Sequence, residues 1–376
     1  MADTRTTSST SSSSQWARLL FLVVGPVIVS VIYWADGFDP ALLPEHGSWP
    51  SRAVPARNDH ILEVVEKLGD GLLPGAEDLA YDSEAHVLYT GCGDGWIKQV
   101  RLADAASSVT VDNWAHVGGR PLGIALGHDK ELIIADADKG LLRLTREGAV
   151  ELLTNEAEGL KFRLTDGVDV ASDGMIYFTD ASHKYSVDEH LMDVMEGRPN
   201  GRLMSYDPWT KKTQVLVRGI YFANGVALSP QQDFLIFCET VLRRCRKYHI
   251  EGEKKGSVDN FVDNLPGYPD NIRYDGDGHF WIGITAVRTL FWDWMMSNPF
   301  ARKTLVILKK FVEVPHMQHD GGMLGVSLEG ELLALYSDPA LFGVTSGLKV
   351  GNHLYYGLLA GSYIGRIDLN QHAAHA

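Results

Sequence analysis

From about residue 60 onward the chain consists of short apolar segments separated by turns. Segments such as HVLYTG, MIYFTD, FLIFCET and HFWIGIT mix apolar and polar side chains over six or seven residues, and Gly, Asp, Asn and Pro cluster between them. Short segments of this kind with regular turn spacing are typical of all-β barrels, sandwiches and propellers. We therefore expect an all-β domain over residues 60–370.

One phrase recurs along this domain: a marked residue, then an alternating apolar segment, then a polar turn. The clearest copies are NGVALSPQQD and DNIRYDGDG, and weaker copies are EDLAYD, DGVDVASD, LGIALGHD and LGVSLEG. Most copies lie about 45 residues apart, which leaves room for the four strands of one propeller blade. Six copies predict a six-bladed β-propeller whose inner strands begin at the marked residues, which are Glu77, Leu122, Asp166, Asn224, Asp270 and Leu324.

The marked residues would form a ring at one mouth of the central channel, and this ring is acidic. It brings together Glu77, Asp166, Asn224 and Asp270, with Asn271 beside the last of them. Uncompensated carboxylates in a narrow apolar channel are costly, so either some are protonated or a cation lies among them. Oxygen ligands without His or thiolate favour a hard cation, and we predict a Ca²⁺ site. The alternative is that each is an ordinary turn residue at a strand start, which leaves their common register unexplained.

Three connections are longer than the repeat requires: residues 182–202, 287–314 and 316–323. The first contains VDEHLMDVMEG, which predicts a short helix that ends at Gly197. The second contains TLFWDWMMSNPF, which is too apolar for an ordinary exposed loop. Such a segment marks a binding surface or a membrane contact, or else it packs on neighbouring blades.

We expect the first two connections to roof the channel on the same face as the ring. Substrate would then contact Trp292, Trp294 and Tyr185. Helical spacing places Phe291, Trp294 and Met295 on one face of a short amphipathic turn. The outer aromatic side chains of this segment are expected to reach the bilayer.

The N-terminal part of the chain predicts a membrane anchor. Residues 1–15 form a Ser/Thr-rich tail, residues 16–34 form an apolar segment with aromatic ends, and residues 35–59 form a Pro-rich linker. The apolar segment is long enough to cross a bilayer once as a helix. Arg5 and Arg18 precede or begin it and acidic residues follow it, so we expect a type II protein with a lumenal propeller. A cleaved signal peptide and a buried core helix are the alternatives.

Charge and cysteine content narrow the picture further. A formal net charge of −14 argues against a nucleic-acid partner, because phosphate binding needs Lys/Arg clusters. Three Cys residues do not make a disulfide scaffold. Cys238 and Cys245 flank a predicted hairpin and could face each other across it, but we favour two buried thiols over a disulfide.

The sequence also resembles a known family. Segments that carry the resemblance include PGAEDLAYD, LTDGVDVASDGMIYFTDASHKYS, YFANGVALSP and LPGYPDNIRYDGDGHFWIGIT. Over roughly residues 62–369 they are similar to the plant strictosidine synthase-like family and to the animal adipocyte plasma membrane-associated protein. A more remote similarity is to the paraoxonase, gluconolactonase and squid-type phosphotriesterase propellers.

This resemblance implies a six-bladed propeller with calcium in its central tunnel. It assigns metal ligands to Glu77, Asn224 and Asp270, with Asn271 beside them. The hydrolase relatives have an Asn-Asp pair where this chain has Thr165 and Asp166, so Asp166 is the nearest oxygen donor in the third blade.

The resemblance does not transfer the synthase reaction. True strictosidine synthases use a glutamate late in the last blade, and alignment places Thr345 or a neighbouring small residue there. No Glu follows Glu331, so the general acid/base of the condensation is missing.

We therefore expect a calcium-dependent hydrolase of a small hydrophobic ester or lactone, in the endoplasmic reticulum or vacuole. Asp270 is the expected base or nucleophile, and His183, His316 and His319 are candidate proton carriers. The alternative is a non-catalytic, membrane-tethered propeller that binds a ligand or a protein.

Overall fold

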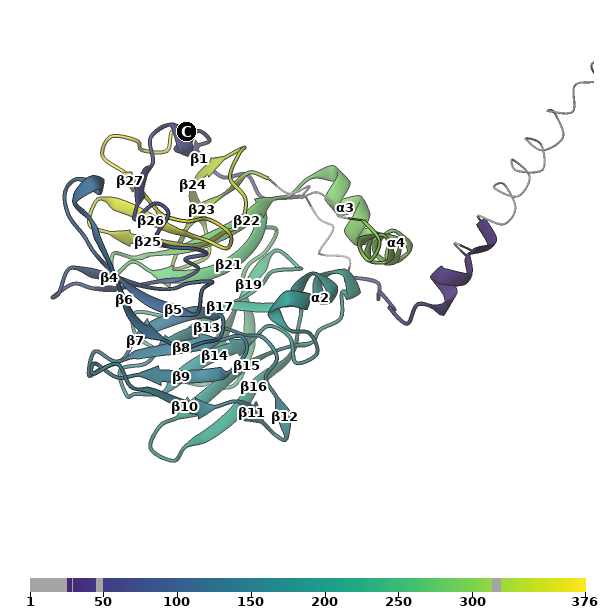
Figure 1. Ribbon diagram of the computed structural model, residues 1–376, viewed down its shortest axis with the longest axis horizontal. Helices are drawn as coiled ribbons and strands as arrows, with labels where there is room; N and C mark the ends of the chain where they lie inside the picture. The colour runs from purple at the N-terminus through teal and green to yellow at the C-terminus, as the bar shows by residue number, and fades with distance from the viewer. Residues whose placement is uncertain (1–25, 29, 45–49, 313–318) are drawn as a thin grey trace, which may run out of the picture.

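The protein folds as a six-bladed β-propeller, as the repeat predicts. The computed structural model describes residues 26–28, 30–44, 50–312 and 319–376. Six sheets surround a central axis, and the four blade strands of each sheet pair antiparallel (Figure 1). The innermost strands of consecutive blades contact each other in a closed circle, β3–β7–β13–β17–β21–β25 and back to β3.

The first three blades follow the chain from the axis outward. Blade 1 contains β3 (Leu79–Asp82), β4 (Val87–Gly91), β5 (Trp96–Arg101) and β6 (Thr110–His116). Blade 2 contains β7 (Pro121–Leu126), β8 (Leu132–Asp136), β9 (Gly140–Leu144) and β10 (Val150–Thr154). Blade 3 contains β13 (Thr165–Val170), β14 (Ile176–Asp180), β15 (Gly201–Asp207) and β16 (Lys212–Ile220). The small hairpin of β11 (Glu156–Ala157) and β12 (Leu160–Lys161) lies between blades 2 and 3.

The last three blades include two strands from the N-terminal side. Blade 4 contains β17 (Ala223–Leu228), β18 (Phe234–Glu239), β19 (Arg244–His249) and β20 (Val258–Val262). Blade 5 contains β21 (Gly267–Tyr274), β22 (His279–Val287), β23 (Gly321–Ser327) and β24 (Leu332–Asp338), with β1 (Ala56–Asn58) added in parallel at its edge. Blade 6 contains β25 (Val344–Val350), β26 (His353–Leu358) and β27 (Ile364–Asp368), and β2 (Glu66–Leu68) completes it.

The sixth blade closes the circle by pairing the two ends of the domain. β2 runs antiparallel to β27, with Glu66 opposite Arg366. The Nε of Arg366 donates to Oε2 of Glu66 over 2.6 Å. A strand from the N-terminal side thus protects the outer edge of the last sheet.

The prediction that Leu324 begins the inner strand of blade 6 is wrong. Leu324 lies in β23, the third strand of blade 5. The inner strand of blade 6 is β25, and Thr345 lies near its start. β23 is buried along nearly its whole length, as inner strands such as β21 are, so the sequence pattern alone does not separate a third strand from an inner one.

The apolar core lies between neighbouring sheets. For example, Ile236 and Cys238 of blade 4 belong to one buried cluster with Ile272, Phe280 and Ile282 of blade 5. This packing of sheet face on sheet face repeats around the axis and leaves the inner strand ends free to carry polar residues.

Two connections carry the helices, and both lie on the same side of the propeller (Figure 1). The connection from β14 to β15 contains η4 (Val187–Glu189) and α2 (His190–Glu196), and α2 ends at Gly197 as predicted. The connection from β22 to β23 contains α3 (Leu290–Ser297) and α4 (Pro299–Lys309). The shorter helices η2 (Ile61–Glu63) and η3 (Ala106–Ser108) lie elsewhere on the domain.

Local sequence explains where α3 and α4 begin. The Thr289 hydroxyl accepts a hydrogen bond from the Trp292 amide, and the Asn298 side chain accepts one from the Ala301 amide. Both are N-cap interactions, and Pro299 occupies the first turn of α4, where its missing N–H costs nothing. The expected face of α3 is partly wrong, because Met295 is buried with Trp292 whereas Phe291 and Trp294 are exposed.

The segment before the propeller packs on these helices. The Ala41 amide donates to the carbonyl oxygen of Glu196 over 2.8 Å, and the guanidinium of Arg302 donates to the Ala41 and Met195 carbonyls. Arg302 is fully buried, and burial lowers its pKa to about 10. One arginine of α4 therefore joins α2 to residues 35–44.

Most of the expected transmembrane segment, residues 16–25 and residue 29, lies outside the described residues, as does the tail of residues 1–15. Residues 26–28 and 30–35 are helical. None of the helices within the described ranges has both the length and the apolar character needed to cross a bilayer.

Cys238 and Cys245 form a disulfide rather than two buried thiols, which corrects our expectation. They are directly opposite each other in β18 and β19, with Cα atoms 4.0 Å apart. Cys92 is buried and free.

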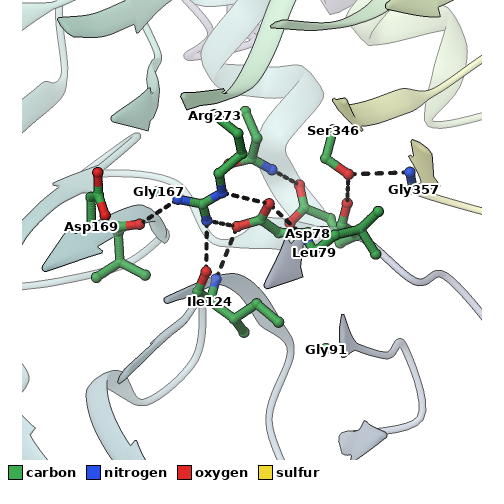
Figure 2. A network of polar contacts seen from close by, with 12 residues as sticks. Asp78, Leu79, Gly91, Ile124, Gly167, Asp169, Arg273, Ser346 and Gly357 are labelled. Atoms are coloured by element: carbon green, nitrogen blue, oxygen red, sulfur yellow. Dashed lines mark hydrogen bonds and ion pairs between the residues drawn. The ribbon is translucent and has the colours of Figure 1, made fainter. Parts of the chain in front are cut away.

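Below the mouth of the channel, Arg273 of β21 braces four blades. Its guanidinium pairs with the buried Asp78 and donates to the carbonyl oxygen of Ile124 (2.7 Å), as Figure 2 shows. It also donates to the carbonyl oxygen of Val168 (2.9 Å). Asp78 in turn accepts a hydrogen bond from the Ile124 amide over 3.0 Å. One cation thus holds blades 1, 2, 3 and 5 together at the axis.

We predict that Arg273→Met lowers the free energy of unfolding by about 3–5 kcal/mol, because it leaves the buried Asp78 carboxylate without its partner. Urea unfolding followed by fluorescence measures this change. The matched control is Arg143→Met, which removes an exposed pair with Glu151 and should cost less than about 1 kcal/mol. Equal losses in the two variants would show that Arg273 is not a structural brace.

Candidate functional site

The inner strands depart from regular pairing where the ring residues lie. Register shifts occur in β7, β13, β17, β21 and β25, between residues 121 and 124, 165 and 168, 223 and 226, 269 and 272, and 344 and 346. Such bulges re-aim side chains out of the regular pleat. Five inner strands therefore carry the same local irregularity at the mouth of the channel.

Glycines allow these inner strands to approach one another closely. Gly123, Gly167 and Gly225 directly follow ring residues in blades 2, 3 and 4. A Cβ atom on Gly167 would lie 2.8 Å from the Asn224 carbonyl oxygen, which is closer than real contacts allow. The narrow channel, and with it the convergence of the ring residues, depends on the missing side chains.

The structure brings the predicted acidic residues together. Glu77, Asp166 and Asp270 are 2 %, 4 % and 8 % exposed, and each offers one carboxylate oxygen within 4.8 Å of the others. Asn224 and Asn271 are also buried. The Nδ2 of Asn271 donates to Oε1 of Glu77 over 2.8 Å, so that residue orients a carboxylate.

Three oxygens of this cluster lack hydrogen-bond partners within the described structure. They are Oε2 of Glu77, Oδ1 of Asp166 and Oδ1 of Asn224. A buried acceptor without a partner is costly, and three at one place is unusual. Hard cations such as Ca²⁺ take six to eight oxygen ligands in flexible geometry, so these residues fit a calcium ion.

The pKa values of the clustered carboxyl groups also favour a bound cation. Burial raises the pKa of Glu77 well above its ordinary value, and the nearby Asp270 and Asp78 raise it further. Burial and the Glu77 charge do the same to the pKa of Asp166. Burial and the Asp166 charge raise the pKa of Asp270, against a hydrogen bond from Asn224 that lowers it. Without a cation these carboxyl groups hold protons to unusually high pH.

Three residues complete the mouth in ways that the sequence did not reveal. The Thr345 hydroxyl donates to the backbone oxygen of Glu77 over 2.7 Å, and the Ser346 hydroxyl donates to the same oxygen over 2.9 Å. Arg120 donates to the Gly75 carbonyl oxygen over 2.9 Å, and its charge lowers the pKa of both Glu77 and Asp166. None of these three residues lies in the repeated phrase that marks the carboxylates.

A cavity of about 660 Å³ has the carboxylate cluster among its lining residues. Its acidic part comprises Glu77, Asp166 and Asp270 together with Asn224. Most of the remaining wall is apolar and includes Leu122, Leu164, Phe222, Tyr268, Trp292 and Phe342. Val187 of η4 and Leu191 and Val194 of α2 cover one side, as expected of a roof. A small apolar molecule with one polar group suits this space.

The three expected substrate-contacting residues do not come together. Trp292 lines the cavity and is buried. Trp294 is 53 % exposed and lies outside the cavity lining, against Phe291. Tyr185 is also outside the lining and contacts Lys184 through its ring.

The expected histidines lie away from the carboxylates. The Nδ1 of His183 hydrogen-bonds with the Asn200 carbonyl oxygen over 2.6 Å, and His319 is exposed and pairs with Asp320. Neither lines the cavity, and His316 lies outside the described residues. His190, the first residue of α2, does line it. The sequence contains no local signal that would have singled out His190.

Comparison with known proteins identifies the relatives of this chain. The strictosidine synthase family model matches residues 166–253. The chain is 47 % identical to strictosidine synthase-like protein 6 of Arabidopsis thaliana over 360 residues, covering 95 % of this chain and 96 % of the relative. It is 33 % identical to the adipocyte plasma membrane-associated protein of Bos taurus, covering 82 % and 79 % of the two chains.

Solved structures agree on the fold. A gluconolactonase from Xanthomonas campestris aligns with a TM-score of 0.58 at 15 % identity, covering 84 % of this chain and 95 % of the other. Regucalcin from Agrobacterium tumefaciens, described as a calcium-binding protein, aligns with a TM-score of 0.58 at 14 % identity and the same coverage. At such low identity these structures establish the shared propeller architecture. The relatives at higher identity go further and show that the chain belongs to the strictosidine synthase-like family.

Proposed function

We propose that the protein is a calcium-dependent hydrolase of small apolar esters or lactones. The observation that carries this proposal is the cluster of Glu77, Asp166 and Asp270, whose buried oxygens face one another at an apolar cavity. The names of two proteins with this fold, a gluconolactonase and a calcium-binding regucalcin, support the choice of lactone and of calcium.

Calcium at this cluster would polarise a substrate carbonyl and stabilise the negative charge that develops on its oxygen. The chain itself supplies the proton transfers and the binding surface. Asp270 takes a proton from the water that attacks the carbonyl carbon. The acyl C–O bond then breaks, and the released alkoxide oxygen receives the proton that Asp270 holds. The apolar walls bind the acyl or ring portion.

The other residues considered for proton transfer are not assigned a role in this mechanism. His183 and His319 do not line the cavity, so the proposal gives them no step. The condensation reaction of true strictosidine synthases is disfavoured, because the Thr345 hydroxyl already donates to a backbone oxygen and is no general acid or base at neutral pH.

We further propose that the propeller lies in the lumen of the endoplasmic reticulum or vacuole, held by residues 16–34 as a type II anchor. The Cys238–Cys245 disulfide supports an oxidising compartment. The name of the adipocyte plasma membrane-associated relative supports membrane association.

Removal of calcium should lower the melting temperature, and by more at pH 8 than at pH 5. The raised pKa values of Glu77, Asp166 and Asp270 mean that the metal-free folded state holds protons that the unfolded chain releases above about pH 4. Stability of the metal-free protein is therefore lost as the pH rises through the raised folded pKa values.

Calcium binds the ionised carboxylates and offsets this loss, so we expect a difference of about 5 °C between calcium-loaded and chelated protein at pH 8. Scanning calorimetry with calcium and with EDTA at the two pH values measures it. Mg²⁺ should restore less than Ca²⁺, because its octahedral demand suits this cluster poorly. An identical melting curve in chelator at pH 8 would rule out the site.

Hydrolysis of a panel of apolar aryl esters and lactones tests the activity itself. We expect turnover that EDTA abolishes and that Asp270→Ala lowers by about 100-fold or more, because the variant lacks both a ligand and the base. Trp292→Ser should raise KM for apolar substrates by about tenfold while calcium affinity stays unchanged.

The matched control is Trp294→Ser, which changes an exposed tryptophan two residues away and should leave KM as it is. Turnover that survives EDTA or Asp270→Ala would contradict the mechanism. Complete inactivity of folded, calcium-loaded protein would favour a propeller that only binds a ligand.

A further inference from the structure

The exposed apolar side chains are concentrated on one part of the molecule. Among the described residues, twelve of the eighteen large hydrophobic side chains that are exposed belong to residues 26–34 or to residues 290–312. From the second range they are Leu290, Phe291, Trp294, Phe300, Leu308, Phe311 and Val312. Scattered exposed hydrophobic residues are normal, but a concentration of this kind marks an interaction surface.

Five of these seven side chains lie on α3, which contributes Trp292 to the cavity lining, or on α4, which contacts α3. Trp292 of α3 faces the cavity, whereas its neighbours Phe291 and Trp294 face outward. Helix α4 is amphipathic: Ala301, Arg302 and Val306 are buried, and Phe300 and Leu308 are exposed. The burial requirements of the propeller therefore do not account for the outer apolar side chains.

The helical residues 30–35 are fixed to α4 at one end. The Lys310 ammonium pairs with the Asp36 carboxylate over 2.5 Å, and the Lys303 ammonium donates to the Asp36 carbonyl oxygen over 2.9 Å. The Tyr33 ring lies 5.0 Å from the Phe300 ring between centroids. A groove of about 660 Å³ lies between them, and apart from Ser30 and Thr304 its lining is apolar or aromatic.

We propose that this surface, formed by α3, α4, residues 26–28 and residues 30–34, docks on a lipid bilayer and turns the roof of the cavity toward the membrane. This inference is independent of catalysis. Three features favour a bilayer over a second protein. The sequence of residues 16–25, WARLLFLVVG, continues the apolar character directly into this surface. Its aromatic side chains, Trp34, Trp294 and Phe300, are of the kind that prefer the lipid–water boundary.

The third feature is Lys309, the last residue of α4, which is exposed beside the exposed Leu308, whereas Asp36 holds the ammonium groups of Lys303 and Lys310. Lysines suit a membrane boundary, where their ammonium groups reach the headgroups, but they are depleted at protein–protein interfaces.

Quenching of a fluorescent label by lipid tests the proposal with the full-length chain in phosphatidylcholine vesicles. Trp294→Cys is labelled with bimane, and quenching by a nitroxide on lipid acyl chains is compared with quenching by a water-soluble nitroxide. The native Cys92 thiol should not react, because burial raises its pKa to about 12. We expect the lipid nitroxide to quench the label at position 294 severalfold more than the aqueous one does.

The matched control is Trp209→Cys. Trp209 is 85 % exposed and lies between β15 and β16, a connection at the end of the propeller opposite the β14–β15 roof. Its label should show the reverse preference. The proposal is overturned if the protein does not bind vesicles, if positions 294 and 209 behave alike, or if position 294 is shielded from both quenchers, as contact with a second protein would cause.

Discussion

The convergence of buried carboxylates at the channel mouth is the constraint on which the rest of the structure depends. Glu77, Asp166 and Asp270 come from blades 1, 3 and 5, so they meet only if the circle of inner strands closes. Closure in turn needs β2 to complete blade 6, glycines that let inner strands approach, and bulges that turn side chains toward the axis. Two arginines reduce the electrostatic repulsion among these carboxylates. Arg273 pairs with Asp78 and also interacts with Glu77, and Arg120 lowers the pKa of Glu77 at the mouth. These two cations leave the three carboxylates of the mouth only partly compensated, which is why a bound cation is the natural completion.

The roof links this site to the N-terminal segment. Phe38 belongs to the same buried cluster as Trp292, Met195 and Val306, so residues before the propeller pack with the two helical connections. Arg302 fixes that arrangement through the Met195 and Ala41 carbonyls. A change in the position of the N-terminal segment would therefore shift α2 and α3, which line the cavity. The proposed membrane attachment therefore has a physical route to the site.

Much of this architecture could be predicted from the sequence because each blade repeats the same short pattern of polar and apolar residues. Polar residues before alternating segments identified four ring residues and the six-bladed fold. The sixth blade was misplaced at Leu324 because β23, a third strand, is buried along nearly its whole length as inner strands are, so the sequence pattern does not distinguish the two. Thr345 was singled out only because it aligns with a family position. That its hydroxyl donates to the Glu77 backbone oxygen could not be predicted, because blades 1 and 6 meet only when the circle of inner strands closes.

Loop residues were least predictable: whether His183, His190 or His319 reaches the cavity depends on the path of long connections. Likewise the facing of Cys238 and Cys245 followed from hairpin register, but whether they are oxidised did not.

The central claim is that the convergent carboxylates form one calcium site, and calorimetric titration of calcium into metal-stripped protein tests it most directly. The account predicts one ion bound per chain, and loss of that binding in Asp166→Asn. Asp136→Asn serves as the matched control, because Asp136 is an equally buried carboxylate of β8 outside the cluster, with a pKa that burial raises to about 6. It should bind calcium as the unaltered chain does. Absence of calcium binding by the unaltered protein, or equal binding by Asp166→Asn, would contradict the account.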